Sequence, residues 1–202
     1  MDLSKKNLKR YEIKFSITSK EKNEFINKNK LKKLFPDRTV ESIYFDTNDF
    51  QFFHLSEEGV TPRFKIRLRG YNNKNLDNLE IKTTNNYHRE KIVIKNFKFN
   101  NYELHKNLKK MGINQVVQKK IRVKYLRSYY ELEKIGRITL DRNIEFLPPE
   151  KIFHNSKKIE RIILEVKVQK NIDKNFIEKI INLKESRFSK YCMGINCLRE
   201  TN

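Results

Sequence analysis

The sequence has no tryptophan and only two cysteines, Cys192 and Cys197, with no cluster of Cys or His residues around them. A zinc site is therefore not indicated, and we expect both thiols to be reduced and buried. The four histidines are scattered without metal-ligand spacing. With only five glycines in the chain, there is no P-loop, no glycine-rich phosphate cradle and no nucleophile motif. These absences exclude the nucleotide-binding loops that depend on glycine.

Long apolar runs are also missing. No stretch approaches the roughly 20 apolar residues that a membrane-spanning helix needs, and the first residues lack the apolar core of a secretory signal. We therefore expect a cytoplasmic protein without a membrane span. The chain has 202 residues and no internal repeat. This length suits a single domain, predicted over residues 1–202.

Positive charge is abundant. The chain has 45 Lys and Arg residues against 25 Asp and Glu residues, a formal net charge of +20. Such an excess requires an anionic partner, which could be a nucleic acid, an anionic membrane or a polyphosphorylated small molecule. Composition by itself favours nucleic acid, so the positions of the charges must decide between these classes.

Alternation of polar and apolar residues predicts about eight strands. They are expected at residues 9–17, 40–45, 63–69, 79–83, 89–95, 119–132, 137–146 and 161–168. Apolar residues at helical spacing predict helices at about residues 20–34, 102–111 and 173–184, the first with a capping box at Thr18 and Glu21 and an end before Pro36. Residues 46–49 are predicted to form a turn or a cap, followed by a short helix or loop to Leu55.

The polar faces of these strands carry cations beside carboxylates or hydroxyls at i, i+2 spacing. Arg63, Lys65, Arg67 and Arg69 share one face of a single strand, for example. We predict an α+β fold in which an antiparallel β-barrel of about eight strands has a polar, basic lumen and a few flanking helices that cover the apolar faces. Burying so many unpaired cations would cost several kcal/mol each, so the lumen must hold water and an anion.

Arginine pairs bidentately with phosphate oxygens and lysine adds a point charge, so these faces suit a linear run of phosphates. The candidate phosphate-binding cations are Arg10, Lys14, Lys65, Arg67, Arg69, Lys82, Arg127, Arg137 and Lys167. Four carboxylates on the same faces could neutralise these cations or hold Mg²⁺ or Mn²⁺, and we favour a metal for Glu165. They are Glu12, Glu80, Asp141 and Glu165. Ser189 and Lys190 add a hydroxyl and an ammonium on a C-terminal segment that could close one mouth of the barrel.

Eight motifs, in order along the chain, resemble those of the VTC domain, a member of the triphosphate tunnel metalloenzymes. The motifs lie at residues 10–14, 42–47, 65–69, 79–82, 125–127, 137–141, 164–167 and 189–191. Residues 83–91 depart from the family's basic-rich pattern after Lys82. The resemblance implies an antiparallel tunnel barrel, Mn²⁺ or Mg²⁺ as cofactor, and polymerisation of inorganic polyphosphate from the γ-phosphate of ATP. It also implies a role for each matching residue, with Glu165 as the metal ligand and Glu12 at the superfamily's acidic position in the first strand. The implied phosphate ligands are Lys14, Arg67, Arg69, Lys82, Tyr125, Arg127, Lys167, Ser189 and Lys190.

Several functions stay open at this stage. A polyphosphate polymerase would use its cations, chiefly Lys14, Arg67, Arg69, Arg127 and Lys167, to stabilise the transferred phosphoryl group. A triphosphatase would transfer the same group to water, and a sensor of polyphosphate or nucleotide would bind without turnover. A nucleic-acid binder is disfavoured because carboxylates on the same strand faces would repel a nucleic-acid backbone. The expected ligands are therefore ATP or another triphosphate and inorganic polyphosphate, while the sequence leaves the oligomeric state open.

Overall fold

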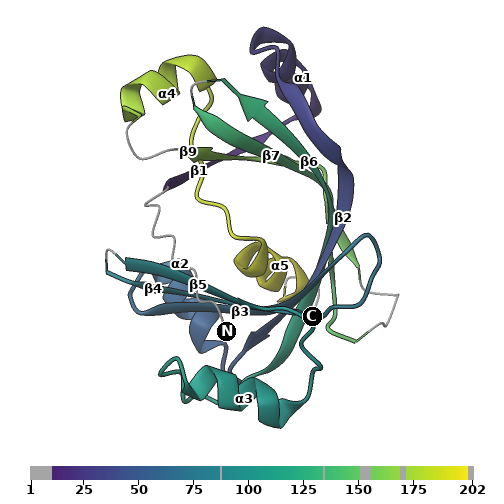
Figure 1. The fold of residues 1–202 in the computed structure, drawn as a ribbon, viewed down its shortest axis with the longest axis vertical. Helices are drawn as coiled ribbons and strands as arrows, with labels where there is room; N and C mark the ends of the chain where they lie inside the picture. Colours follow the sequence, from purple (N-terminus) through teal and green to yellow (C-terminus); the bar gives the residue numbers. More distant parts are fainter. Residues whose placement is uncertain (1–10, 87, 134, 151–155, 169–171, 200–202) are drawn as a thin grey trace. The chain divides into compact units, whose positions relative to one another are not determined.

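The computed structural model describes residues 11–86, 88–133, 135–150, 156–168 and 172–199, and contains both strands and helices (Figure 1). The elements, in chain order, are β1 (Tyr11–Ile17), α1 (Ser19–Lys28), β2 (Lys32–Asp46), α2 (Gln51–Glu58), β3 (Arg63–Tyr71), β4 (Asn78–Asn85), β5 (His88–Ile94), α3 (Asn101–Lys109), β6 (Gln118–Leu132), β7 (Gly136–Leu147), β8 (Lys157–Ile159), β9 (Ile162–Val168), α4 (Lys174–Ile181) and α5 (Lys190–Arg199). None of the helices in these described ranges is long and apolar enough to cross a membrane.

The strands form one sheet with the hydrogen-bonded order β1-β9-β7-β6-β2-β3-β4-β5, while β8 pairs with β7. The pairs β1–β9, β2–β3, β3–β4, β4–β5, β7–β8 and β7–β9 are antiparallel. The prediction of an α+β fold on an antiparallel sheet of about eight strands is confirmed. It could be made because the two-residue period of each strand separates a polar face from an apolar one.

The chain divides into two compact units, each made of segments that are distant in sequence. The first contains residues 1–38, 126–143 and 160–188, and the second contains residues 39–125, 144–159 and 189–202. The longest strands, β2 and β6, and also β7, contribute residues to both units. The expectation of a single domain over residues 1–202 stays a prediction.

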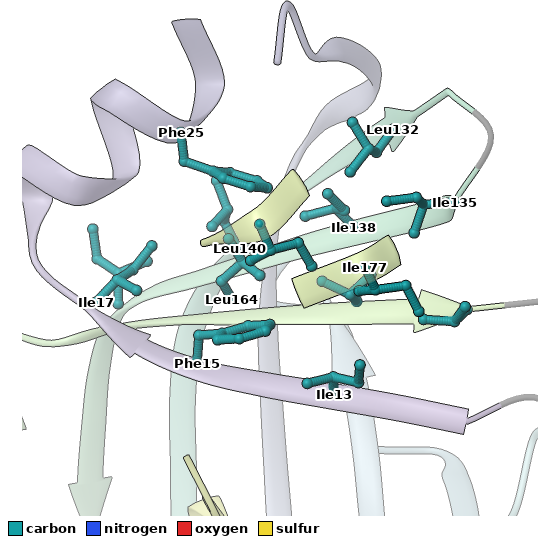
Figure 2. Close-up of a cluster of buried hydrophobic side chains, with 14 residues drawn as sticks. Ile13, Phe15, Ile17, Phe25, Leu132, Ile135, Ile138, Leu140, Leu164 and Ile177 are labelled. Atoms are coloured by element: carbon teal, nitrogen blue, oxygen red, sulfur yellow. The ribbon is translucent and has the colours of Figure 1, made fainter. Parts of the chain in front are cut away.

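In the first unit, the apolar faces of β1, β7 and β9 are covered by helices (Figure 2). Phe25 of α1 and Ile177 of α4 pack into the same buried cluster as Phe15, Ile138 and Leu164. Each of these side chains is less than a tenth exposed, and burial of one such side chain stabilises a fold by about 1.5–3 kcal/mol. The predicted covering of the apolar strand faces by amphipathic helices is therefore found in this unit.

In the second unit, a separate apolar cluster lies against β3 and β4. Leu104 and Leu108 of α3, together with Phe52 of α2, pack with Ile66 and Ile81. Because Ile66 and Ile81 are register partners on adjacent strands, their apolar face is the reverse of the face that carries Lys65, Arg67 and Arg69. The helices thus leave the cationic face of β3 turned away from this core.

The first helix is shorter than the sequence predicts. Its capping box is present, since Glu21 N–H donates to Thr18 Oγ1 and the Thr18 N–H donates to the Glu21 carboxylate. The helix ends at Lys28, and the chain then passes through Lys30 in the left-handed region, with φ of 47°. Leu34 and Pro36, expected in or just after the helix, instead lie in β2. The prediction was wrong here because strand pairing along a 15-residue strand outweighs a weak helical pattern.

The N-terminus of the second helix is capped by side chains that lie four to five residues before it. Asp46 accepts the backbone N–H groups of Phe52 and Phe53 through its two carboxylate oxygens, and Thr47 Oγ1 accepts the N–H of Gln51. These bonds satisfy the first free N–H donors of α2. They also place the negative charge of Asp46 at the positive end of the helix dipole, which is favourable. The predicted capping role of residues 46–49 is confirmed, and the stretch after it is a helix.

Two elements were not foreseen. The short strand β8 was not predicted, and the C-terminal segment, for which no helix or strand was predicted, forms helix α5. Gly194 lets α5 approach the sheet: a Cβ there would lie 2.7 Å from the ring of Phe146 and closer still to Ile121. Both side chains are fully buried, so α5 is held by close packing that sequence periodicity does not reveal.

Candidate functional site

Two arginines and a lysine converge on Glu80 in the second unit. Arg67 donates from Nε and Nη2 to one carboxylate oxygen at 2.8 and 2.5 Å, and Arg69 Nη1 lies 3.5 Å from that oxygen. Lys91 Nζ donates to the other oxygen at 2.9 Å. Arg67 and Glu80 are register partners on β3 and β4, so the strand pairing itself produces this contact.

Glu80 as a whole residue is only 3% exposed. Burial would raise the pKa of Glu80, but the charges of Arg67 and Arg69 outweigh burial and hold the pKa well below its usual range. Glu80 is therefore ionised and acts as a neutralising partner, one of the two roles considered for it. One buried negative charge faces three positive ones, so this cluster has a net positive charge.

Three buried hydroxyls orient the two guanidinium groups. Ser42 Oγ and the Tyr125 hydroxyl accept from Arg69 at 3.0 and 3.2 Å, and the Tyr44 hydroxyl accepts from Arg67 at 2.8 Å. Ser42 and Tyr44 were missed as site residues. They lie at i, i+2 spacing on β2, opposite Arg69 and Arg67, so the polar face of residues 40–45 was the signal that could have identified them.

A row of lysines continues the cationic face across three strands. Lys65, Lys82 and Lys91 are neighbours in register on β3, β4 and β5. Lys65 Nζ donates to Ser189 Oγ at 3.0 Å, and Lys190 Nζ lies 4.8 Å from the centroid of the Tyr125 ring. Lys91 was missed because residues 83–91 depart from the family pattern.

The first unit has its own polar cluster on β1, β9 and β7. Lys167 Nζ lies 3.4 Å from a carboxylate oxygen of Glu12 and 3.4 Å from one of Glu165. Glu12 is the register partner of Lys167, and Lys14 is the register partner of Glu165. Glu165 is 8% exposed, so the Lys167 ammonium group contacts two carboxylates, one of which is buried.

The donors around Glu165 fit a hard divalent cation. Thr139 lies opposite Glu165 in register and is 1% exposed, and among the residues that the structure describes its hydroxyl has no hydrogen-bond partner. No group of three or more His, Cys, Asp or Glu side chains in the described ranges is arranged to hold a metal ion. Mg²⁺, however, is commonly bound by one or two carboxylates together with substrate phosphates. Glu12 and Glu165 match that kind of site.

The remaining predicted residues of this unit are placed around the same strands. Arg127 donates from Nε and Nη2 to the two carboxylate oxygens of Asp141 at 2.6 and 2.8 Å, so Asp141 also neutralises a cation. Lys14 Nζ donates to the carbonyl oxygen of Phe188 at 3.0 Å. Arg137 is exposed and is the register partner of Lys167. Arg10, also predicted to bind phosphate, lies outside the described residues.

Each unit thus collects part of the predicted site. The second unit brings together Lys65, Arg67, Arg69, Lys82, Tyr125, Ser189 and Lys190. The first brings together Glu12, Lys14, Arg127, Arg137, Glu165 and Lys167. Ser189 and Lys190 stand at the start of the packed helix α5, and the next residue, Tyr191, is 2% exposed.

Solved structures with this fold come from distant proteins. The PH1819 protein from Pyrococcus horikoshii aligns with a TM-score of 0.56 at 16% identity, over 95% of this chain and 99% of that one. A candidate adenylate cyclase from Bacillus halodurans aligns with a TM-score of 0.54 at 13% identity, over 88% and 92%. HpAC1 from Hippeastrum, a candidate adenylyl cyclase described with a dominant triphosphatase activity, aligns with a TM-score of 0.53 at 13% identity, over 92% and 94%.

These alignments show that the antiparallel sheet of this chain has the same fold as these proteins. No curated protein sequence matches the chain. The VTC domain family matches residues 8–199, nearly the whole length. The chain belongs to the VTC domain family.

Proposed function

We propose that this protein is a metal-dependent phosphotransferase of the polyphosphate polymerase type, which transfers the γ-phosphate of ATP to a growing chain of inorganic phosphate. The observation that carries the proposal is the cluster of Arg67, Arg69 and Lys91 around the buried carboxylate of Glu80. Membership of the VTC domain family supports the same conclusion. The proposed substrates are ATP or another triphosphate, and inorganic polyphosphate.

The charge balance of the cluster favours an anionic ligand. The side chains of Arg67, Arg69 and Glu80 are 14%, 5% and 5% exposed, so solvent screens the excess positive charge poorly. Phosphate oxygens accept bidentate bonds from guanidinium groups and compensate charge without a change in the fold. Lys65 and Lys82 extend the cationic surface to the next position along the strands, which supports a ligand with several phosphates in line.

The residues on the polar faces would act through charge and position. Loose transition states of phosphoryl transfer spread negative charge over the equatorial oxygens, and fixed cations stabilise it without a protein nucleophile. Arg67 and Arg69 are the proposed catalytic cations of the second unit. Lys14, Arg127 and Lys167 are those of the first. Ser189, Lys190 and Tyr125 would bind phosphate oxygens beside them.

Glu165 and Glu12 are the proposed ligands of Mn²⁺ or Mg²⁺. When bound, such an ion withdraws charge from the phosphate oxygens that complete its coordination shell. Lys167, which contacts both carboxylates, would hold them in place and contribute a cation to the same phosphates. The buried hydroxyl of Thr139 offers a further oxygen beside Glu165.

The test is to incubate the purified protein with ATP and Mn²⁺ or Mg²⁺, and to follow three products. Polyphosphate is detected by gel electrophoresis with a polyphosphate stain, and ADP and free phosphate are assayed in solution. A ladder of polyphosphate formed together with ADP supports the polymerase. Free phosphate without polymer would identify a triphosphatase instead, and tight binding of triphosphate without turnover would identify a sensor.

A further inference from the structure

Tyr44 occupies the centre of the cationic cluster in the second unit, although it is not among the predicted site residues. It is the register partner of Arg67 and is 4% exposed. Its ring stacks on that of Tyr191 with centroids 5.4 Å apart and an angle of 23° between the planes. The Arg67 guanidinium carbon lies 5.6 Å from the Tyr44 ring centroid. The position of the phenol is thus fixed by the strand, by α5 and by an arginine.

The hydroxyl of Tyr44 accepts a hydrogen bond from Arg67 Nη1 at 2.8 Å. A tyrosine hydroxyl also carries a proton of its own to donate. In the part of the chain that the structure describes, no hydrogen bond runs from this hydroxyl to an acceptor. A buried donor that lacks an acceptor is costly, so the arrangement favours an acceptor that arrives with a ligand.

The neighbouring carboxylates are already occupied. Glu80 on β4 is engaged by Arg67, Arg69 and Lys91. Asp46 on β2 accepts two backbone N–H groups of α2 and the hydroxyl of Tyr191. Other groups that face the cluster are donors or hydroxyls, and they include Ser42 on β2, Lys65 on β3, Tyr125 on β6 and Lys190 on α5.

We propose that Tyr44 is a substrate-contacting residue, whose hydroxyl donates to an oxygen of the same phosphate that Arg67 binds. This inference rests on the proposed phosphate-binding function of the cluster and adds to it a neutral donor. Arg67 would then hold both the phosphate and the phenol oxygen, and so present the phenol proton to the ligand.

The electrostatics of the cluster give this contact a measurable signature. Burial would raise the pKa of Tyr44, but the charges of Arg67 and Arg69 outweigh burial and lower it to about 8. The phenol can donate to a phosphate only while it is protonated. Above pH 8 it becomes an anion facing an anionic ligand, so the affinity for phosphate should fall as the pH rises through this range.

The experiment is a calorimetric titration with tripolyphosphate, without metal, at pH 7 and pH 9.5. The variants are Tyr44→Phe and the control Tyr102→Phe, whose residue is 74% exposed on α3. At pH 7 we expect Tyr44→Phe to bind about tenfold more weakly than the natural protein, as for the loss of a hydrogen bond to a charged group. All three proteins share the titration of the ligand and of the lysines. Only the natural protein and Tyr102→Phe also lose the phenol proton of Tyr44, so they should lose more affinity at pH 9.5 than Tyr44→Phe does.

A second measurement needs no variant. Absorbance at 295 nm should show one tyrosine of the natural protein ionising near pH 8, and saturating tripolyphosphate should move this ionisation to higher pH. An unmoved midpoint would overturn the inference, as would equal affinities and pH profiles for Tyr44→Phe and the natural protein. If the natural protein binds no tripolyphosphate at any pH, the proposed function itself fails.

Discussion

Glu80 shows how one residue can hold a charged cluster together. It is the shared partner of Arg67, Arg69 and Lys91. The pKa of Glu80 in the folded protein is held below its usual range. The ion pairs of Glu80 therefore stabilise the fold fully at pH values above the ordinary pKa of glutamate. That stability should be lost progressively as the pH falls below this range and the carboxylate is protonated.

A Glu80→Gln substitution keeps the size of the side chain but leaves the buried cations uncompensated. We expect the free energy of unfolding at pH 7 to fall by about 3–5 kcal/mol, as for other broken buried ion pairs. Urea denaturation measures this loss. Tripolyphosphate should restore more stability to Glu80→Gln than it adds to the natural protein, since it supplies the missing negative charge. An equal gain in both proteins would count against a phosphate site at this cluster.

Glu165 is the residue on which the metal assignment depends. A Glu165→Gln substitution removes the charge that a divalent cation requires and retains a side chain of the same size. We expect Mn²⁺ binding, followed by electron paramagnetic resonance, to weaken by at least tenfold, and turnover of ATP to be lost, while tripolyphosphate still binds without metal. The matched control is Glu24→Gln on the exposed face of α1. Unchanged Mn²⁺ affinity in Glu165→Gln would refute the assignment.

At the scale of elements, helix α5 depends on a single glycine. Helix α5 places Lys190 beside the cationic cluster. At Gly194 the helix packs against Ile121 and Phe146. An alanine would favour the helix intrinsically by about 1 kcal/mol. Because both neighbours are fully buried, however, the added methyl group must displace packed side chains, at a cost of about 1–3 kcal/mol.

We therefore expect Gly194→Ala to lower the melting temperature by a few degrees and to weaken tripolyphosphate binding. The loss of stability follows from the displaced packing, and the weaker binding follows from a shift of the start of α5 away from the cluster. The control is Asn196→Ala on the same helix, which also raises helix propensity, though by less than Gly194→Ala does, at a partly exposed position. Its melting temperature should be unchanged or higher. A Gly194→Ala protein more stable than Asn196→Ala would show that the packing is looser than the structure indicates.

At the scale of the whole molecule, the net charge of +20 must attract many polyanions at low salt. Specific and non-specific binding can be separated by ionic strength. Contacts to an exposed basic surface are strongly screened, whereas buried charge pairs are screened much less. A single-stranded oligonucleotide should therefore lose at least about a hundredfold in affinity between 50 and 200 mM salt, and tripolyphosphate about tenfold or less.

The same comparison can be made with Arg67→Ala. We expect this variant to bind tripolyphosphate at least about thirtyfold more weakly, because it removes a largely buried cation, with little effect on the oligonucleotide. Lys109→Ala, which removes one exposed cation from α3, should leave tripolyphosphate binding unchanged. Equal losses for both ligands in Arg67→Ala would revive the nucleic-acid interpretation.

Local sequence patterns determine several strands, the start of α1 and one cationic face of this protein. The alternation in β3 and β9 identifies strands because side chains of adjacent residues point to opposite faces. Thr18 and Glu21 identify the start of α1 because a capping box is formed within four residues. The same alternation selects Lys65, Arg67 and Arg69 as a cationic face, and the motif order identifies the family. Each of these signals depends only on residues that are close in sequence.

Tertiary structure decided what the cations contact. The sequence could not show that Glu80 forms ion pairs with Arg67, Arg69 and Lys91. It also could not show that Lys167 contacts both Glu12 and Glu165. Strand register sets these partners. Nor could the sequence show that Leu34 belongs to β2, that residues 190–199 form α5, or that Tyr44 meets Arg67. Hydrogen bonding and packing between residues far apart in the chain overcome local preference at these places, and only the folded chain brings such residues together.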